Sequence, residues 1–438
     1  MKFSIYNSSI PLTSKTAMLY NAVSDKFIIY TKGMGSFLSK NPDEVHTIVP
    51  AFYHQLKEGG FLVDKSKDES EYVASIGKKY CTNNKSYNII INPTTNCNFS
   101  CWYCYESHKP NTIMSQDTIK CINKFFEKKC ESGIKNIHIS FFGGEPLLYY
   151  EKVVRPVIDG IRSLILLYKD VTVSLHFTSN GFLVNDKVLE HLMEGKEQKS
   201  FQITLDGNKE RHDKVRFSAS GRGSYERIIN NIKKLAENCI NVNVRINYTK
   251  ENISSLIYII DDFKHFSDDV RNFIHFDFQQ VWQEDGFIED ENKILDCTIE
   301  EFRKEFGRRC VSGHFEHVNT FINPCYADLK NECVVNYNGD VYKCTARDFT
   351  SENRLGYLSE SGDIIWNDDT LITDRICSKF NKKVCKECRI FPICGGGCAQ
   401  LSMEEINDIC PKKRSELEKD NIILDRFYKY VVVRDKER

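Results

Sequence analysis

Three cysteines, Cys97, Cys101 and Cys104, follow an apolar stretch and a turn rich in Pro, Thr and Asn. Thiolates this close in sequence repel one another unless a soft metal neutralises them. A structural zinc site takes four protein ligands, and no fourth Cys or His lies at the usual spacing. A [4Fe–4S] cluster normally has four Cys ligands, so one held by these three would leave an iron open for a small molecule. The spacing therefore predicts an iron–sulfur site with one open iron, and unrelated buried thiols are the alternative.

A second group of cysteines lies near the end of the chain, where nine of the eighteen fall within 86 residues and eight of these nine have the spacing of metal ligands. These eight are Cys325, Cys333, Cys344, Cys385, Cys388, Cys394, Cys398 and Cys410. Eight thiolates are the number that two four-thiolate clusters need, although two CxxC-like pairs alone would also suit a zinc ribbon. Asn338 and Gly339 form a hairpin turn signal that places Cys333 and Cys344 on paired strands. The segment is therefore predicted to be a second metal-bearing domain.

Between the two groups, strand and helix patterns alternate about six times. The predicted strands are residues 88–91, 137–142, 171–177, 201–205, 242–247 and 274–278. Amphipathic helices fit between them, as at residues 116–129 and 224–237. This alternation predicts a parallel sheet with outer helices, which is an α/β barrel or part of one. Chemistry in such a barrel belongs at the C-terminal ends of the strands.

Distinctive polar residues follow these strand ends. Gly143, Gly144, Glu145 and Pro146 come after the second strand, where the glycines allow close approach to a ligand and Glu145 offers an acceptor. Residues 178–181, which include Ser179 and Asn180, come after the third strand and could also be a plain polar turn.

The fourth and sixth strands lead into charged residues. Asp206 and Gly207 precede His212, Asp213 and Arg216, whose guanidinium suits a bidentate pair with a carboxylate. Asp277 lies at the end of the sixth strand and could act as a base or contact a substrate. A lone acid at such a place is more often a hydrogen-bonded turn residue.

Composition places the protein among ordinary globular proteins, with 438 residues, 41% apolar and 28% charged residues. The net charge of −1 gives no reason to expect a nucleic-acid or membrane-surface partner. The first fifteen residues lack the apolar core of a signal peptide, and no apolar run is long enough to span a bilayer. We therefore expect a cytoplasmic protein.

The run Cys97-x3-Cys101-x2-Cys104, with Tyr103 before the last Cys, resembles the signature of radical S-adenosylmethionine (SAM) enzymes. In that family the open iron chelates the amino and carboxylate groups of SAM, which is cleaved to a 5′-deoxyadenosyl radical that abstracts hydrogen from the substrate. The resemblance implies contacts to SAM, for which the candidates are Tyr103, Gly143, Gly144, Glu145, Pro146, Ser179, Asn180, Asp206 and Arg216. The 143–146 turn would bind the amino group, residues 179–180 the ribose, and Arg216 the carboxylate.

The later cysteines resemble the SPASM domain of peptide- and protein-modifying radical SAM enzymes, through Cys325-x13-Gly339-x4-Cys344 and the Cys385–Cys398 run. The resemblance implies two auxiliary [4Fe–4S] clusters, hence three in all, with full ligation that leaves them to relay electrons or support the structure. The first would be held by Cys325, Cys333, Cys344 and Cys398. The second would be held by Cys385, Cys388, Cys394 and Cys410.

The predicted fold is a partial (β/α)6 TIM-like radical SAM barrel between a small N-terminal module and the SPASM domain. We expect an N-terminal β/α module at 1–80, the barrel at 85–283, a linker at 284–312, the SPASM domain at 313–415 and a C-terminal helix and tail at 416–438. The N-terminal module is similar to winged-helix elements that hold a leader peptide on a strand edge, and a mere packing cap is the alternative.

The resemblance implies an enzyme that abstracts hydrogen from a ribosomally synthesised precursor peptide and installs a thioether or carbon–carbon cross-link. Its electrons would come from a reductant such as flavodoxin or ferredoxin. One alternative is an anaerobic sulfatase-maturating enzyme that makes formylglycine. Another is a non-catalytic iron–sulfur electron carrier or a zinc scaffold, which would not need the 143–146 turn or Arg216.

Overall fold

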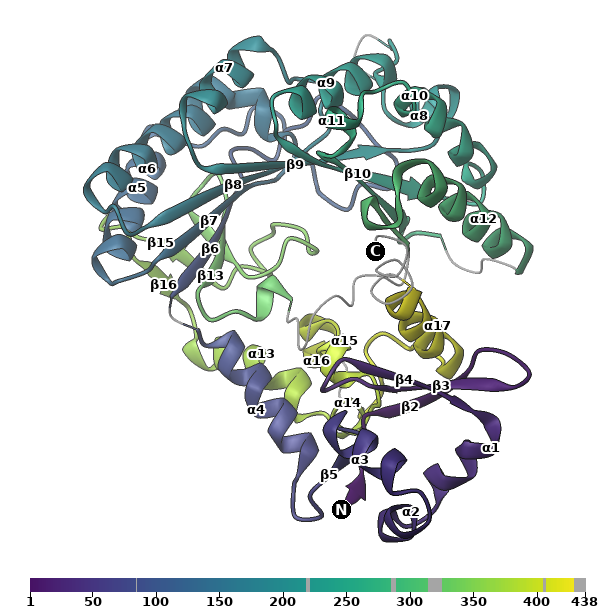
Figure 1. Ribbon diagram of the computed structural model, residues 1–438. Coiled ribbons are helices and arrows are strands. Elements are labelled where there is room, and N and C mark those ends of the chain that lie inside the picture. Colours follow the sequence, from purple (N-terminus) through teal and green to yellow (C-terminus); the bar gives the residue numbers. More distant parts are fainter. Residues whose placement is uncertain (84, 218–220, 285–288, 314–324, 405–406, 429–438) are drawn as a thin grey trace. The chain divides into compact units, whose positions relative to one another are not determined.

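A computed structural model describes residues 1–438 except 84, 218–220, 285–288, 314–324, 405–406 and 429–438. The chain divides into two compact units, which are treated separately below (Figure 1). Unit 1 comprises residues 1–83, 315–330 and 370–438, and unit 2 comprises residues 84–314 and 331–369. No helix of the described residues is long and apolar enough to cross a membrane.

Unit 2 is built on one sheet with the strand order β12-β11-β10-β9-β8-β7-β6-β13-β14-β15-β16. Its consecutive strands from β6 to β12 pair in parallel, and β13 joins β6 in parallel before antiparallel pairing takes over. The bounds are β6 Ser86–Ile91, β7 Asn136–Phe141, β8 Thr172–Ser179, β9 Gln198–Leu205, β10 Asn241–Tyr248, β11 Ile274–Gln280, β12 Val311–Ser312, β13 Glu332–Val335, β14 Asp340–Tyr342, β15 Gly356–Leu358 and β16 Ile364–Trp366. All six predicted barrel strands are present, with ends shifted by up to three residues, and the partial barrel is confirmed.

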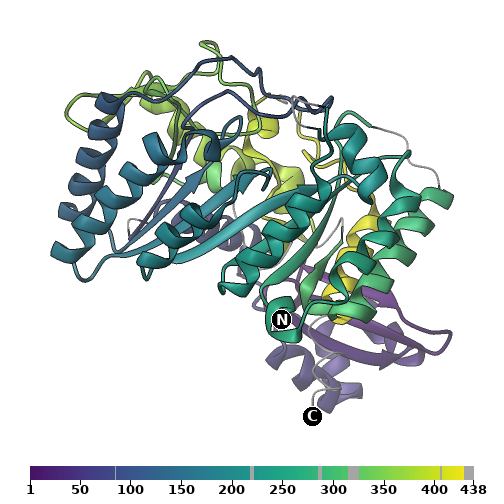
Figure 2. The ribbon, with the colours of Figure 1, turned by 90° about the horizontal axis from the view of Figure 1, so that it is seen from above.

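Helices cover the outer face of the parallel strands (Figures 1 and 2). They are α5 Gln116–Glu131, α6 Arg155–Leu167, α7 Asp186–Glu194, α8 Lys209–Val215, α9 Tyr225–Glu237, α10 Ile259–Phe263, α11 Asp268–Arg271 and α12 Glu289–Phe306, with short turns η2 Pro146–Tyr149, η3 Tyr150–Val154, η4 Ile253–Tyr258 and η5 Arg308–Cys310. Alternate strand residues pack beneath them, and the rings of Phe141, Phe177 and Phe201 stack across three strands at 5.1 and 4.6 Å. Period-two alternation thus gives the sheet an apolar outer face.

The opposite face of the same strands is polar. His138 pairs with Ser174 at 2.6 Å, His176 with Ser200 at 2.8 Å and His275 with Ser312 at 2.7 Å, each across neighbouring strands. Side chains of this kind satisfy one another without an apolar filling. The inner face can therefore bind a polar ligand.

The segment predicted as a linker contains regular structure. Helix α12 buries Leu295, Ile299 and Phe302, and the Phe302 ring meets that of Phe276 on β11 at 5.1 Å. Strand β12 then pairs with β11. The apolar residues recur every three to four positions, which is the pattern of a helix that packs on a core. Residues 289–312 therefore belong to unit 2, and 285–288 lie outside the described residues.

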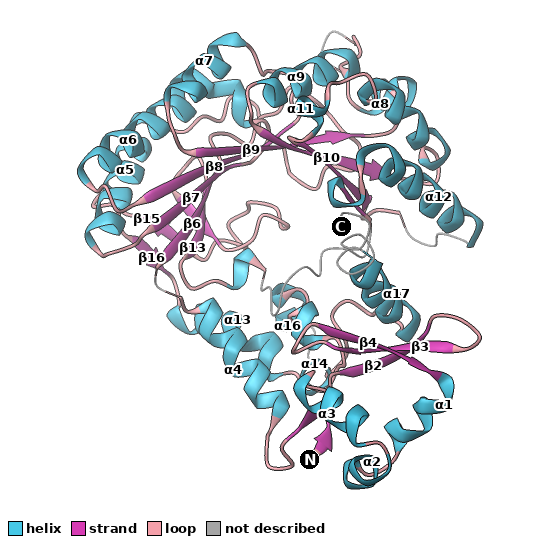
Figure 3. Cartoon of the chain, in the orientation of Figure 1, coloured by secondary structure: helices cyan, strands magenta, loops and turns pink. Residues whose placement is uncertain are grey.

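The N-terminal part of unit 1 is a three-stranded antiparallel sheet followed by helices (Figure 3). Its elements are β1 Lys2–Phe3, β2 Asn7–Pro11, β3 Thr16–Asn21, β4 Lys26–Thr31, α1 Lys32–Gly35, η1 Ser36–Ser39, α2 Pro42–Ile48, α3 Pro50–Glu58, β5 Leu62–Val63 and α4 Glu69–Cys81. Helices α2 and α3 are separate because Pro50 interrupts the hydrogen-bond pattern and starts α3. Leu19, Val45, Leu56 and Phe61 lie in its core.

The later segments of unit 1 pack against this N-terminal part. They comprise η6 Tyr326–Asp328, α13 Asp369–Asn381, α14 Lys383–Lys386, α15 Phe391–Cys394, α16 Ala399–Glu404 and α17 Glu416–Phe427. In α17, Arg426 forms an ion pair with Asp25 at 2.6 Å, and the Phe427 ring meets Phe27 at 5.3 Å. The Tyr6 hydroxyl donates to the carbonyl of Lys386 at 2.7 Å. The N-terminal module is thus bonded to the segment that carries the last cysteines, while the tail at 429–438 lies outside the described residues.

Candidate active site

The first cysteine group lies on the loop that leaves β6. Hydrogen bonds from Thr94 to the carbonyl of Thr112 at 2.6 Å, and from Asn96 N–H to the Thr94 hydroxyl at 2.9 Å, hold the start of the loop. Burial raises the pKa of Cys97 to about 12 and that of Cys104 to about 11, and Cys101 is raised in the same way. Neutral thiols become thiolates when a metal replaces the proton. Three soft donors in a partly buried loop therefore fit an iron–sulfur cluster.

Gly143 and Gly144 press directly on this loop. Gly143 has φ of +89°, and a Cβ there would lie 2.6 Å from the carbonyl oxygen of Thr94. A Cβ on Gly144 would lie 2.1 Å from the carbonyl oxygen of Asn96. The backbone N–H of Glu145 donates to that same oxygen at 2.8 Å. The glycines are thus needed for contact between the 143–146 turn and the loop that carries the cysteines.

Glu145 joins this turn to the end of β8. Its side chain is fully buried and accepts hydrogen bonds from Leu147 N–H at 3.0 Å, the Ser179 hydroxyl at 2.8 Å and Asn180 N–H at 2.8 Å. Burial raises the pKa of Glu145 to about 7 against the effect of these donors. Its carboxylate therefore binds protein groups, and a contact with SAM stays a prediction.

Asn180 reaches back to the cysteine loop. Its amide donates to the side-chain oxygen of Asn98 at 2.8 Å, and its own oxygen accepts from Phe182 N–H at 3.0 Å. Asn98 lies between Cys97 and Cys101. The predicted ribose-contacting residues are therefore brought beside the cluster loop.

Tyr103, Asp206 and Arg216 form one buried network. The Tyr103 hydroxyl lies 2.7 and 2.8 Å from the two carboxylate oxygens of Asp206 and accepts from Arg216 at 2.5 Å. The guanidinium Nε of Arg216 also binds Asp206 directly. Asn247 adds a donor to the Tyr103 hydroxyl at 3.2 Å. Residues from the cysteine loop and from the segment after β9, which the sequence singled out separately, thus meet in one place.

His212, Asp213 and Ser224 fix the segment that carries Arg216. The N–H of Asp206 donates to His212 Nδ1 at 3.3 Å, so the ring proton is on Nε2, which lies 3.0 Å from the Ser224 hydroxyl. Ser224 donates in turn to the carbonyl of Arg216 at 2.6 Å, and Asp213 accepts from Ser224 N–H at 2.8 Å. Burial lowers the pKa of His212 to about 4. These residues position Arg216 without reaching its guanidinium.

Asp277 lies in the middle of β11, opposite Arg245 in the register of β10. It is buried and accepts from the Gln279 amide at 2.9 Å, and it raises the pKa of Arg245, which burial lowers overall. Tyr103 acts on Arg245 in the same direction. Asp277 is thus a strand residue with a charged neighbour in Arg245, and a role as base stays a prediction.

Two functional candidates escaped the sequence analysis. Asn247 donates a hydrogen bond to the Tyr103 hydroxyl. Its position at the end of a predicted strand could have identified it as a candidate. His108 Nε2 lies 3.4 Å from Cys104 Sγ, and its position four residues after that cysteine was the signal there.

The proposed ligands of the second auxiliary cluster all lie in unit 1 and are close together. After burial, the groups that raise the pKa of Cys385 most are Cys394, Cys410 and Cys388. Arg414 donates to Cys394 Sγ at 3.3 Å. Gly395, Gly396 and Gly397 all have positive φ, between 64° and 81°, which glycine adopts without strain. Four mutually close thiols beside a left-handed turn and a cation fit a four-thiolate cluster.

Cys333 is more buried than Cys325, Cys344 and Cys398, the other predicted ligands of the first auxiliary cluster, and its place in that ligand set stays a prediction. Its side chain is 0% exposed within the main core of unit 2, and the Tyr87 hydroxyl hydrogen-bonds its sulfur. After burial, Glu332, Tyr87 and Lys343 influence its pKa most. The strand alternation of β13 turns this residue toward the helices, as it does Val335. The predicted hairpin is present, with Gly339 at φ of +85°, and Cys333 is on β13, whereas Cys344 lies two residues beyond the end of β14.

The remaining predicted ligands of the first auxiliary cluster are divided between the units. Cys325 and Cys398 belong to unit 1, whereas Cys344 belongs to unit 2. This ligand set stays a prediction. Among the described residues, no three Cys, His, Asp or Glu side chains are grouped to hold a single metal ion.

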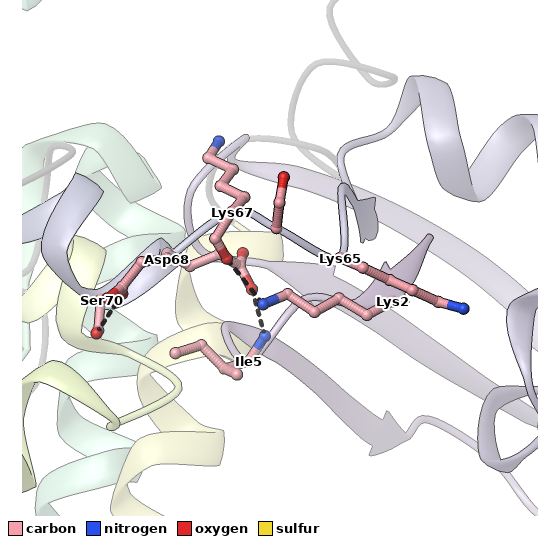
Figure 4. A pocket seen from close by; sticks show the side chains of 8 residues that line it. Lys2, Ile5, Lys65, Lys67, Asp68 and Ser70 are labelled. Carbon is pink, nitrogen blue, oxygen red and sulfur yellow. Dashed lines mark hydrogen bonds between the residues drawn. The ribbon is translucent and has the colours of Figure 1, made fainter.

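A cavity of about 320 Å³ lies in unit 1 at the start of α4, beside Lys2, Lys65 and Lys67 (Figure 4). Its acidic residues already have partners. Glu69 accepts from Ser4 at 2.6 Å and from Ile5 N–H at 3.0 Å, and Asp68 caps the helix at Glu71 N–H. Lys2 donates to the carbonyl of Lys67 at 2.7 Å. The contacts explain local folding and add no catalytic group.

Known families match two parts of the chain: the radical SAM superfamily at residues 91–263 and an iron–sulfur cluster-binding domain, SPASM, at residues 325–389. A cysteine-type anaerobic sulfatase-maturating enzyme of Clostridium novyi is 26% identical over 72% of this chain and 88% of its own. The radical SAM cyclopropyl synthase TigE of Paramaledivibacter caminithermalis is 24% identical over 81% of this chain and 76% of its own.

Two solved structures share the fold. The anSMEcpe structure with bound AdoMet and the Cp18Cys peptide covers 80% of this chain and 97% of its own, with a TM-score of 0.57 and 18% identity. Streptococcus suis SuiB bound to the precursor peptide SuiA covers 93% of this chain and 97% of its own, with a TM-score of 0.52 and 15% identity. The chain therefore carries a radical SAM domain and, after it, a SPASM iron–sulfur domain, and these domains indicate an enzyme.

Proposed function

We propose that this enzyme modifies a ribosomally synthesised precursor peptide and installs an intramolecular thioether or carbon–carbon cross-link. It would hold three [4Fe–4S] clusters and take electrons from a flavodoxin or ferredoxin. The cluster and SAM, when bound, supply a 5′-deoxyadenosyl radical that takes a hydrogen atom from the peptide. The protein's own contribution is positioning and exclusion of water, since such a radical is unselective.

The observation that carries the proposal is the extent of the fold match. The correspondence with SuiB spans 93% of the chain, against 80% for anSMEcpe. The larger coverage by SuiB supports the proposal that this chain has a module beyond the barrel and the SPASM domain, as SuiB does. In the present chain, β4 lies at one edge of a three-stranded sheet and exposes Ile29, which is 57% accessible. An edge strand of this kind can add a peptide by main-chain hydrogen bonds.

The site residues divide the work. Cys97, Cys101 and Cys104 would hold the SAM-binding cluster, and Arg216, fixed by Asp206 and Tyr103, would bind the SAM carboxylate. The guanidinium donates two hydrogen bonds to these partners, from Nε to Asp206 and from Nη2 to the Tyr103 hydroxyl, and a guanidinium held in this way suits a pair with a carboxylate. Residues 143–146 and 179–180 would then line the amino group and ribose.

The inner face would receive the peptide. The His–Ser pairs that cross between its strands offer donors and acceptors to a peptide backbone. Asp277 is the candidate for the base. Tyr105 and Trp282, 37% and 60% exposed and stacked at 5.6 Å, would support an apolar side chain near the cluster loop. Asp277 would accept a proton if cross-linking requires one.

A second candidate is formylglycine formation on a sulfatase. The match to the C. novyi sulfatase-maturating enzyme has the higher identity of the two relatives above and favours it. The two functions predict different products, so one mass measurement separates them.

The test is anaerobic co-expression of the enzyme with a short peptide encoded beside its gene, followed by mass spectrometry. Loss of two hydrogen atoms with a fragmentation gap between two residues supports the cross-link. Replacement of a Cys sulfur by a carbonyl oxygen in a sulfatase peptide supports the second candidate. An unmodified peptide in the presence of SAM cleavage would contradict the proposal for that peptide.

Leader binding has its own test in the same system. Ile29→Asp should weaken peptide binding in a fluorescence polarisation assay, because it places a charge on the exposed face of β4. Ile48→Asp is the matched control, since Ile48 is 54% exposed on α2 and lies away from the sheet edge. Equal affinities of the two variants would assign the module a packing role only.

A further inference from the structure

Within unit 2, the loop that carries Cys104 is bonded to the segment that follows Cys344. The N–H of Ser107 donates to Asp348 at 3.1 Å, and the Ser107 hydroxyl binds the second oxygen of the same carboxylate. Asp348 lies four residues beyond Cys344. A residue of the SPASM domain, in the connection between β14 and β15, therefore fixes a residue of the radical SAM loop.

The Asp348 segment is itself rigidly held. Asp348 also accepts from Phe349 N–H at 2.9 Å, and its carbonyl accepts from the Asn353 amide at 2.8 Å. The Phe349 ring is buried and meets Tyr342 of β14 at 5.2 Å. A buried aromatic anchor of this kind locks the position of its neighbours.

His108, in the same loop, contacts the predicted cluster ligand Cys104. His108 is one residue beyond Ser107, and its Nε2 lies 3.4 Å from Cys104 Sγ. Cys104 also donates its N–H to the carbonyl of Cys101 at 3.1 Å, so the sulfur is fixed from the backbone side as well. The distance is that of an N–H donor to sulfur, and such bonds shift the potential of an iron–sulfur cluster.

We propose that His108 is a positioning residue that donates a hydrogen bond to the Cys104 thiolate and raises the potential of the SAM-binding cluster, and that Asp348 holds it there through Ser107. The bond stabilises negative charge on the sulfur, which favours the reduced cluster. The SPASM domain would thus change the potential of the SAM-binding cluster through a direct contact, apart from any electron transfer. The inference rests on Cys104 as a cluster ligand.

The experiment measures the midpoint potential of the SAM-binding cluster in the intact holoenzyme by EPR-monitored redox titration. The change that SAM causes in its spectrum identifies this cluster among the others. His108→Phe should lower the potential, and His108→Gln, whose amide can donate, should restore part of it. His46→Phe, at an exposed histidine of unit 1, should leave it unchanged. Iron content of each variant confirms that the clusters are present.

Asp348→Ala separates positioning from charge. Removal of a nearby negative charge by itself raises a cluster potential, whereas release of His108 lowers it. We expect the lower value, and we expect His108→Phe with Asp348→Ala to shift no further than His108→Phe alone. Glu352→Ala, an exposed acid of the same segment, is the charge control.

An unchanged potential in His108→Phe with full iron content would overturn the proposal, and so would a higher potential in Asp348→Ala. No peptide is present in the measurement, so either result stands independently of the peptide that the enzyme modifies. Failure of the cross-linking proposal would leave the potential shift intact.

Discussion

Tyr103 shows how one hydroxyl can organise a site. It binds Asp206 and accepts hydrogen bonds from Arg216 and Asn247, so all three residues depend on a single oxygen. Tyr103→Phe leaves two buried donors without that acceptor. We expect SAM affinity to fall about tenfold, which corresponds to roughly 1.4 kcal/mol. Equilibrium dialysis with labelled SAM measures it, and unchanged affinity would show that Asp206 alone positions Arg216.

The iron content of two variants should distinguish Cys333, which is buried in the core, from Cys394, which is one of four neighbouring thiols. Cys333→Ala removes a buried thiol from an apolar core, so the iron per chain should stay constant while stability falls by about 1 kcal/mol. Cys394→Ala removes a thiol from the close group of four and should cost about four iron atoms per chain. Iron analysis after anaerobic reconstitution decides between them. Loss of iron in Cys333→Ala would instead support its predicted place among the ligands of the first auxiliary cluster.

At the scale of elements, the turn after β7 is fitted to the cysteine loop with no space to spare. Gly144→Ala would put a Cβ 2.1 Å from a backbone oxygen that cannot move without shifting the loop. We expect loss of the first cluster and a destabilisation of about 2 kcal/mol or more. Gly33→Ala is the control, because nothing lies within 4 Å of a Cβ there. Iron content and thermal unfolding should differ between the two; equal behaviour would contradict the close contact.

The stability of the protein should depend on pH through His212, which lies in α8 between β9 and α9. Its folded pKa is lowered from 6.5 to about 4, so it stays neutral in the folded protein while the unfolded chain takes up a proton below pH 6.5. Stability is therefore complete above pH 6.5 and falls as the pH drops toward 4, by roughly 3 kcal/mol in all.

His212→Asn keeps an acceptor for Asp206 N–H and removes the titrating group. Thermal unfolding between pH 8 and 5.5 should show a steeper loss in the wild type than in this variant. The clusters are common to both proteins, so the difference reports on residue 212. Parallel curves would contradict a buried neutral imidazole.

At the scale of the whole molecule, the N-terminal module and the last cysteines form one unit. Arg426 binds Asp25, and Lys386 binds both the Tyr6 hydroxyl and Glu71. Deletion of residues 1–80 would expose the partners of these contacts. We therefore expect that deletion to lose iron from the second auxiliary cluster as well as peptide binding. Iron analysis of the truncated protein, compared with Ile29→Asp, checks this, and full iron in the truncated protein would show that the two parts fold independently.

Local chemistry was readable from the sequence alone. The spacing of Cys97, Cys101 and Cys104, the glycines before Glu145 and the strand pattern from residue 88 depend on neighbours in the chain, and period-two and helical repeats fixed the six barrel strands. Burial and partner choice were not readable, because they depend on residues distant in sequence. The helix at 289–306 begins well before the short helix that the charged stretch indicated around residues 300–306.

The dependence of burial and contacts on residues distant in sequence also explains which features of the site could be predicted. The number and spacing of the cysteines predicted iron–sulfur sites, because thiolate chemistry depends on the count and type of donors, and the resemblance to a known family implied SAM. Only the tertiary structure decided that Cys333 is enclosed beside Tyr87 and that Glu145 binds protein donors. Only it brought Asp348 to the loop of Cys104. A residue's role follows from what its side chain touches, and contacts across more than two hundred residues are set by the packing of the whole sheet.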